Sequence, residues 1–313
     1  MNKHILIKLI LVFSLTVPTW SQAETTPENY SQLYVFGNSL SDTGNLASVV
    51  GNLPYPFYFN RISNGPVAVE ILAARLGLTV DASLHVVGPA IGSNYAVASA
   101  DAFGNKLQDL STQITLFHAN HGFVAPSTAL YVMFIGGNDI LHTRRLATDE
   151  EAHAAILAAV DSINTSMQSL ILAGAKRFLL VNSPNAALLP AILSLAEENN
   201  DPELVERMRK YSKFFRNKLH ALEENLEEAY PVNITEFDLF KHFNKIVKKA
   251  DDYGFSNSTE ACFSRDPYSF HPDCNFGLSF DQFIFFDEIH PTAKVHQIIG
   301  DAMYQTMTNE EDN

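Results

Sequence analysis

A serine on a sharp turn is the first residue in this chain that could do chemistry. The run FGNSLSDTGN, from Phe36 to Asn45, follows the apolar stretch Leu33 to Phe36, which is predicted to be a buried strand. The chain then turns at Gly37 and presents Ser39 before a predicted helix. The Ser39 hydroxyl would project from the strand end, beside backbone N–H groups that face outward. Serine at its free pKa is a poor nucleophile, so another part of the chain must supply a base.

A base is available near the C-terminus, in the segment Asp287-Glu288-Ile289-His290-Pro291. Three residues apart, the carboxylate of Asp287 can orient the imidazole of His290 and stabilise it once it is protonated, as the acid of a catalytic triad does. A lone Asp-x-x-His pair is usually a surface turn. The Pro-Thr pair and the helix predicted after it favour a rigid corner instead.

A third set of residues could stabilise an oxyanion. Gly136-Gly137-Asn138-Asp139 follows the apolar stretch ALYVMFI. An asparagine amide on such a turn can donate a hydrogen bond to a developing negative charge, which is typically worth about 3–4 kcal/mol in the transition state. An ordinary Gly-Asn turn is the alternative. The segment Gly92 to Ala100 supplies small residues, so a backbone N–H could approach a substrate there.

The elements that must position these residues alternate between strands and helices. Apolar runs predict strands at Leu33–Phe36, Asn94–Ala98, Ala129–Ile135, Arg177–Val181 and Val232–Phe237. Helical spacing and end signals predict helices at Pro66–Leu76, Leu107–Asn120, Glu150–Ala173, from the cap Asp201 to about Glu228, and at Thr292–Thr306.

Near-continuous apolar strands between helices indicate an α/β protein with a parallel sheet that is covered on both faces. Ligands of such sheets bind at the carboxyl ends of the strands. Ser39, Asn138 and the segment after Ala98 all lie just past predicted strands. We therefore expect them to converge at one edge of the sheet.

The chain has 313 residues, of which 46% are hydrophobic, and this suits one large domain or two small ones. Residues 1–23 have the outline of a secretory signal peptide: Lys3 and Lys8 precede the apolar run Leu9 to Val17, and Ser21-Gln22-Ala23 resembles a cleavage site. The apolar run is too short to span a bilayer, and no later segment reaches the required ~20 apolar residues. We therefore expect a soluble, secreted protein that begins near Glu24.

Charge limits the possible partners. Removal of Lys3 and Lys8 changes the formal net charge from −14 to −16. An acidic protein of this kind repels nucleic acid and anionic lipid surfaces at long range. Nucleic acid is therefore excluded as a partner, and a membrane substrate would have to be reached through peripheral, apolar contact.

The chain contains two cysteines, Cys262 and Cys274. In an exported protein an isolated pair is expected to form one disulfide, which for a loop this short stabilises the fold by roughly 3 kcal/mol. The loop at 262–274 either only stabilises the fold through its disulfide, as a staple, or also controls access to the site, as a gate. It lies just before the Asp287–His290 segment and contains Arg265 and two prolines, so we expect it to be exposed and cleavable.

Four blocks occur in the order FGNSLSDTGN, NYA, GGND and DEIHP, and together they resemble the blocks of the GDSL, or SGNH, hydrolase family. Arg61 to Pro66 (RISNGP) is similar to the RFSNGP segment of many members. The resemblance runs from about Tyr34 to the C-terminus. Size, export signal and the late cysteine pair look most similar to bacterial secreted lysophospholipases A of the Legionella type and to glycerophospholipid–cholesterol acyltransferases.

The resemblance implies a fold and a site. The fold would be a single SGNH hydrolase domain over residues 24–313, a three-layer α/β/α sandwich with a flavodoxin-like parallel sheet. Ser39 would be the nucleophile, and His290 the general base and then acid, oriented by Asp287. The Ser39 N–H, the N–H at the second block and the Asn138 amide would form the oxyanion hole. Related acyltransferases are activated by proteolysis in a disulfide loop, which implies an activating protease acting between the two cysteines.

Two positions depart from the family pattern. The Asp that precedes the nucleophile in the family is Asn38 here, a change that leaves the triad untouched. The second block usually reads NYAxGGA, and this chain has Ala98-Ser99-Ala100. Aligned by motif, the glycine of the oxyanion hole becomes Ser99, which can still supply a backbone N–H if the glycine conformation is not required. Gly92 is the alternative donor.

The resemblance implies an exported serine esterase that cleaves the acyl ester of lysophospholipids through an acyl-enzyme, which water or a sterol hydroxyl resolves, with no cofactor. Another SGNH esterase, acting on short-chain, aryl or carbohydrate acetyl esters, is an alternative. A non-catalytic lipid- or glycan-binding module on the same fold is a second. His118 and His121 have helical spacing but no evident third ligand, so no metal site is predicted.

Two aromatic stretches bear on the substrate. Pro54 to Phe59 contains four aromatic residues soon after the nucleophile, and they could line an acyl-chain trough or form a satellite core cluster. Phe283 to Phe286 is predicted to be a buried strand rather than a wall of a lipid site.

Overall fold

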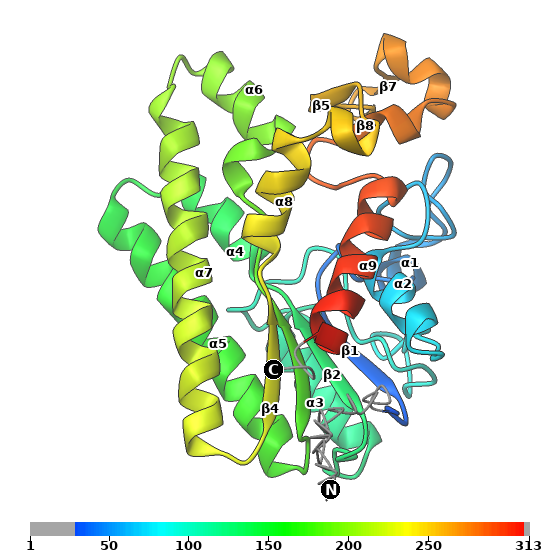
Figure 1. Cartoon of the computed structure of the whole chain (residues 1–313), viewed down its shortest axis with the longest axis vertical. Helices are drawn as coiled ribbons and strands as arrows, with labels where there is room; N and C mark the ends of the chain where they lie inside the picture. The colour runs from blue at the N-terminus through cyan, green and yellow to red at the C-terminus, as the bar shows by residue number, and fades with distance from the viewer. Residues whose placement is uncertain (1–28, 310–313) are drawn as a thin grey trace, which may run out of the picture.

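A parallel four-stranded sheet forms the centre of the computed structural model, which describes residues 29–309 (Figure 1). The signal peptide predicted at 1–23 lies outside the described residues. The strands are β1 (Leu33–Gly37), β2 (Leu130–Phe134), β3 (Arg177–Val181) and β4 (Asn233–Phe237), in the spatial order β1-β2-β3-β4. Every residue of β1 and β2 is buried, which confirms that near-continuous apolar runs mark a sheet covered on both faces.

The predicted strand Asn94–Ala98 is not a regular strand, although it runs parallel to the free edge of β1. The N–H of Val35 donates to Ser93, and the N–H of Tyr95 donates to Val35. One residue pair further on, the backbone N–H of Gly37 donates to Gln113 Oε1 (2.9 Å) instead of to the segment. The strand prediction was therefore wrong for a local reason: a side chain replaces one bond of the ladder.

With this segment beside β1, the chain order across the sheet is second, first, third, fourth, fifth, as in a flavodoxin-like doubly wound sheet. Helices α2 (Ala68–Arg75) and α9 (Ala293–Asn309) pack together on one face. Helices α3 (Leu110–Asn120), α5 (Asp149–Leu172) and α7 (Glu203–Ala229) cover the other. These five helices match the predicted ones to within a few residues, and the three-layer α/β/α sandwich is confirmed.

Helix α1 (Asn45–Val50) is the helix predicted after Ser39. Three further helices were not predicted, namely α4 (Gly137–His142), α6 (Pro190–Glu198) and α8 (Leu239–Lys248). Of the described helices, only α5 is long and apolar enough to cross a bilayer by length and composition, although the sequence prediction gave no such segment. Ile156, Ile163 and Leu170 of α5 are fully buried in the main core, as in the core helix of a globular domain.

A small β region lies beyond the carboxyl ends of the main strands, at the top right of Figure 1. It contains β5 (Asn257–Ala261) paired with β8 (Phe283–Phe285), and a hairpin of β6 (Phe263–Arg265) and β7 (Tyr268–Phe270). Strand β8 confirms the prediction of a buried strand at Phe283 to Phe286. The predicted disulfide between Cys262 and Cys274 is formed and encloses the hairpin.

A second hydrophobic core holds this region to the sheet. Phe57 packs edge-on against Phe263 and Phe286, with ring centroids 5.7 and 5.4 Å apart. Of the aromatic stretch Pro54–Phe59, the buried member therefore belongs to a satellite core, and Tyr55 and Phe59 are exposed. The acyl-trough interpretation of that stretch does not hold for Phe57.

Candidate active site

Ser39 owes its position to the fixed end of β1. A Cβ on Gly37 would lie 2.5 Å from the carbonyl oxygen of Phe134 on β2, so only glycine fits there. The buried amide of Gln113 clamps the same residue, accepting from the Gly37 N–H at 2.9 Å and donating to its carbonyl at 2.8 Å. Ser39 follows two residues later and is 8% exposed.

Asp42 ties the nucleophile loop to the second sequence block. Its buried carboxylate accepts hydrogen bonds from the backbone N–H groups of Gly44, Asn45 and Leu46, and from that of Ala98 at 2.8 Å. No role was predicted for this residue, although it lies inside the FGNSLSDTGN run. Asp42 is a positioning residue because it fixes the distance between Ser39 and the Ala98–Ala100 segment.

His290 lies within hydrogen-bonding distance of Ser39, although 251 residues separate them. The Nε2 atom of His290 is 2.8 Å from Ser39 Oγ. On the other side of the ring, Nδ1 is 2.8 and 2.9 Å from the two carboxylate oxygens of Asp287. A proton on Nδ1 satisfies the carboxylate and leaves Nε2 free to accept the serine proton.

The Asp287 carboxylate is fully buried and remains charged. Burial by itself raises the pKa of Asp287, but the charge and hydrogen bond of His290 and the backbone N–H groups of Ile289 and His290 outweigh it, so the pKa lies below its usual range. An ionised carboxylate in this position favours the imidazolium that forms when His290 takes a proton.

The segment that contains Asp287 and His290 is a rigid corner, as predicted. The N–H of Phe286 donates to the His290 carbonyl at 2.8 Å, which closes the turn. Thr292 then donates from its N–H and its hydroxyl to the carbonyls of Ile284 and Phe283, at 2.9 Å each. Helix α9 starts at the next residue. The backbone of His290 is therefore fixed between strand β8 and the start of α9.

Asn138 lies in the first turn of α4, directly after β2. Gly136 has φ 106°, and a Cβ there would come within 2.3 Å of the Phe215 ring, so the turn requires glycine. The Asn138 amide donates one hydrogen bond to the Ala100 carbonyl at 2.7 Å. In residues 29–309 no acceptor is found for its second N–H, which is the donor that an oxyanion would use.

Ser99 adopts a backbone conformation that favours glycine. Its φ is +68°, in the left-handed region that favours glycine. Ser99 lines one cleft together with Ser39, Asn138 and His290. Within the described part of the chain, the backbone N–H groups of Ser39 and Ser99 have no hydrogen-bond acceptor. Gly92, the alternative donor, is not among the residues that line this cleft and packs against the backbone of Asp81 and Ala82 instead.

Replacement of Ser99 tests whether its backbone or its side chain matters. Ser99→Gly removes a left-handed strain of about 1 kcal/mol, so we expect equal or higher stability to urea and ester hydrolysis within about twofold of wild type. Ser99→Val should lower hydrolysis at least about tenfold, because a β-branched residue resists positive φ and would shift the N–H. A large loss in the glycine variant would instead make the side chain the working group.

Two hollows meet at the Ser39–His290 pair. The cleft just described is also lined by Ala98, Arg265 and Glu288. The apolar residues that line the second are Leu40, Leu141, Pro184, Ala186, Leu189 and Ile289. An ester bound across Ser39 would therefore have its two substituents in chemically different surroundings.

His296 is a second histidine near the site, and it is fully buried. Burial, and then the charge of His290, lower the pKa of His296 to about 3. Its Nδ1 accepts a hydrogen bond from the backbone N–H of Ala68 at 3.2 Å, which joins α9 to α2. A histidine that stays neutral and is used in this way supports the core and is not the base.

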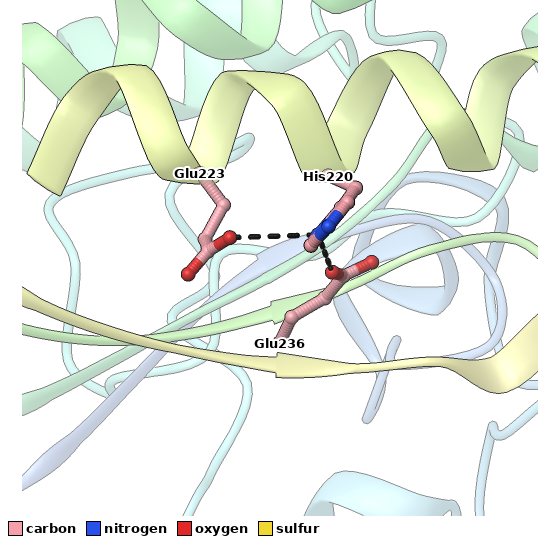
Figure 2. A group of neighbouring side chains, drawn as sticks. All are labelled: His220, Glu223 and Glu236. Carbon is pink, nitrogen blue, oxygen red and sulfur yellow. Dashed lines mark hydrogen bonds and ion pairs between the residues drawn. The ribbon is translucent and has the colours of Figure 1, made fainter.

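One group of three potential metal ligands occurs in the described residues, on α7 and β4 (Figure 2). His220 Nδ1 lies 2.7 Å from Glu236 and 3.6 Å from Glu223. Burial and the neighbouring carboxylates of Glu227 and Glu236 raise the pKa of Glu223 to about 7. None of these residues lines the cleft, and the imidazole already satisfies the carboxylates as an ion pair. His118 and His121 are not part of this group.

The chain is similar to known hydrolases over most of its length. The family model of the GDSL-like lipase/acylhydrolases matches residues 33–303. Phosphatidylcholine-sterol acyltransferase of Aeromonas hydrophila is 28% identical over 262 residues, covering 81% of this chain and 71% of that protein. Thermolabile hemolysin of Vibrio parahaemolyticus is 24% identical, covering 95% and 69%.

Plant enzymes and solved structures show similarity as well. A GDSL esterase/lipase of Arabidopsis thaliana is 25% identical, covering 89% of this chain and 88% of that protein. Among solved structures, an acetylxylan esterase from Geobacillus stearothermophilus superposes with a TM-score of 0.46 at 13% identity, covering 90% of this chain and 96% of that one. The family model covers the four sequence blocks and the whole sheet, and the chain therefore belongs to the GDSL-like lipase/acylhydrolase family.

Proposed function

We propose that the protein is a serine esterase that hydrolyses the acyl ester of lysophospholipids through a covalent acyl-enzyme. The observation that carries the proposal is the continuous hydrogen-bonded chain from Ser39 Oγ through His290 to the buried carboxylate of Asp287. An alcohol next to a base that a third group orients is the arrangement of nucleophilic catalysis.

The first half of the reaction makes the acyl-enzyme. Ser39 Oγ attacks the ester carbonyl while His290 Nε2 takes its proton, and the carbonyl π electrons move to the oxygen. The N–H groups of Ser39 and Ser99 and the free amide N–H of Asn138 stabilise that oxyanion. The C–O bond to the alcohol then breaks as the imidazolium returns its proton to the leaving oxygen.

The second half releases the acid. Water gives a proton to His290 and attacks the acyl carbon, and Ser39 leaves as the imidazolium protonates it. A sterol hydroxyl bound in place of water would accept the acyl group by the same steps. The similarity to a phosphatidylcholine-sterol acyltransferase supports this side reaction. No step needs a cofactor.

We place the acyl chain in the apolar hollow beside Ser39. Leu40, Pro184, Leu189 and Ile289 line it, and the same four residues line a small apolar cavity that reaches Phe243. Apolar clefts of this kind bury hydrocarbon at about 25 cal/mol per Å². The acyl tail would enter here, rather than along the aromatic stretch at Pro54–Phe59.

A substitution at Leu189, which lines both the apolar hollow and the small apolar cavity, tests this placement. Leu189→Phe should narrow the passage, so kcat/KM for a C16 lysolipid should fall at least about tenfold while hydrolysis of a C4 ester stays within about threefold, since one or two lost methylene contacts are each worth a factor of several. Chain-length profiles of both proteins measure this. A sharp acetyl preference in the wild type would replace the lipid assignment with that of a short-chain or carbohydrate acetyl esterase.

Export and peripheral membrane contact belong to the same proposal. Residues 1–23 would be removed as a signal peptide, leaving one catalytic domain from residue 24 to 313. Two apolar side chains near the disulfide loop, Phe276 and Leu278, are 78% and 82% exposed and could contact a lipid surface. Apolar contact of this kind does not depend on charge, whereas the acidic net charge of the protein disfavours binding to anionic membranes.

The disulfide loop at 262–274 would be the target of an activating protease. Its hairpin tip, residues 265–269, is exposed, and Arg265 at the start of the tip lines the cleft. Cleavage between Asp266 and Ser269 should raise lysolipid turnover several-fold, because it frees the tip while the disulfide keeps β6 in place. Mass spectrometry would confirm the cut before turnover is measured. Unchanged turnover in fully cut protein would leave the loop as a staple only.

A further inference from the structure

Arg265 is a cation placed at the active site by the disulfide hairpin. It is the last residue of β6 and pairs with Tyr268 of β7. The base of the hairpin is fixed, since the N–H groups of Cys262 and Phe263 donate to the carbonyls of Phe285 and Phe286 at 3.0 and 2.9 Å. The segment that precedes Asp287 therefore also sets the position of Arg265.

The guanidinium of Arg265 is oriented but has no anionic partner. It stacks over the buried ring of Phe57, 4.9 Å from the centroid, which restricts its rotamers. Within residues 29–309, no carboxylate lies within 4.0 Å of it and no hydrogen-bond acceptor is found for its N–H groups. An arginine whose donors are free suits bidentate recognition of an oxyanion.

Arg265 lies on the side of the site that would receive the alcohol part of the ester. It lines the cleft that contains Ser39, Ser99 and His290, and it is absent from the apolar hollow on the other side. The other charged side chains that line this cleft are the carboxylates of Asp287 and Glu288. The Asp287 carboxylate is paired with His290. Arg265 is therefore the side chain of this cleft that is available to bind an anion.

We propose that Arg265 binds the phosphate of the substrate headgroup and is thereby a specificity-determining residue. The inference rests on the proposed function, because it assigns the glycerophosphate side of a lysophospholipid to this cleft and the acyl tail to the hollow lined by Leu189. Arg265 takes no part in bond making or breaking. It selects phosphate-bearing esters over neutral ones of equal chain length.

The test compares two esters that differ in the phosphate. Arg265→Gln should lower kcat/KM for palmitoyl-lysophosphatidylcholine about 10- to 100-fold, mostly through KM, the usual effect of losing a charge-assisted hydrogen bond. Hydrolysis of 1-palmitoylglycerol and of p-nitrophenyl butyrate should stay within about twofold. Arg265→Lys should recover part of the loss. Arg209→Gln, at an exposed arginine on α7, is the matched control and should change none of these rates.

A binding measurement separates this inference from the proposed function. Glycerophosphocholine should inhibit p-nitrophenyl butyrate hydrolysis competitively in the wild type, and at least tenfold more weakly in Arg265→Gln, even if the enzyme proves to hydrolyse no lysolipid. The headgroup role would be overturned if Arg265→Gln lowered kcat/KM equally for all three esters, or if glycerophosphocholine inhibited both proteins equally. It would also be overturned if Arg265→Gln raised kcat/KM for all three esters, because Arg265 would then restrict access to the site. Wild-type protein that is inhibited by glycerophosphocholine but inactive on lysolipids would refute the substrate alone.

Discussion

Ser39→Ala is expected to lower kcat by a factor of roughly 10⁴ to 10⁶ while leaving the fold intact. Members of a catalytic triad act as a unit, so loss of the nucleophile removes almost all of their joint contribution. The remaining rate above the uncatalysed reaction would come from binding and from the oxyanion donors. Initial rates with p-nitrophenyl butyrate and with a lysolipid, together with Tm, measure the effect.

The chain offers a matched control two residues further on. Ser41 is also buried in the nucleophile loop, and its hydroxyl has no hydrogen-bond partner among the described residues. Ser41→Ala should therefore stay within about threefold of wild type. If Ser39→Ala kept more than a tenth of the wild-type activity, the nucleophile would have to be another residue.

Asp287→Asn is expected to lower kcat by about 10⁴, the size of effect that the wrong histidine tautomer causes. The asparagine oxygen can still accept from the N–H groups of Ile289 and His290, so the turn should persist. Its amide would then donate to His290 Nδ1, which places the ring proton on Nε2. In that tautomer His290 donates toward Ser39 Oγ and cannot take its proton.

KM and Tm of Asp287→Asn distinguish a loss of catalysis from a loss of folded structure. KM should stay within a few-fold of wild type and Tm near that of the wild type, while kcat falls by the factor given above. Asp252→Asn, at an exposed carboxylate outside the cleft, is the control and should change neither parameter. A Tm that fell sharply, with kcat of the folded fraction preserved, would show that Asp287 holds the turn and not the base.

Apolar runs that alternate with helices were enough to predict the sheet, and the carboxyl ends of its strands indicated where functional groups would meet. These runs located all four strands of the main sheet, because a strand buried on both faces has little freedom in its composition. Spacing could not have shown that Ser39 and His290 touch, since they lie on opposite ends of the sequence. That pairing came from the likeness of both motifs to one family, and the structure places their atoms 2.8 Å apart.

Other features depended on contacts that no local pattern records. The Asn94–Ala98 segment has the composition of a strand, and its ladder fails at one position because Gln113, far away in sequence, takes the Gly37 N–H. Asp42 accepts from the N–H of Ala98 and Arg265 lies over the ring of Phe57, and neither contact could be predicted from the residue types alone. Phe57 was ambiguous for the same reason, because burial against Phe263 and Phe286 is set by the hairpin fold.

The most direct test of the catalytic account is covalent labelling with a fluorophosphonate, followed by peptide mass spectrometry. The predicted result is one phosphonyl adduct on the peptide that contains Ser39, formed in step with loss of esterase activity, slowed strongly in Asp287→Asn and absent from Ser39→Ala. Folded wild-type protein that carries no adduct, or that is inactivated through a different residue, would contradict the account.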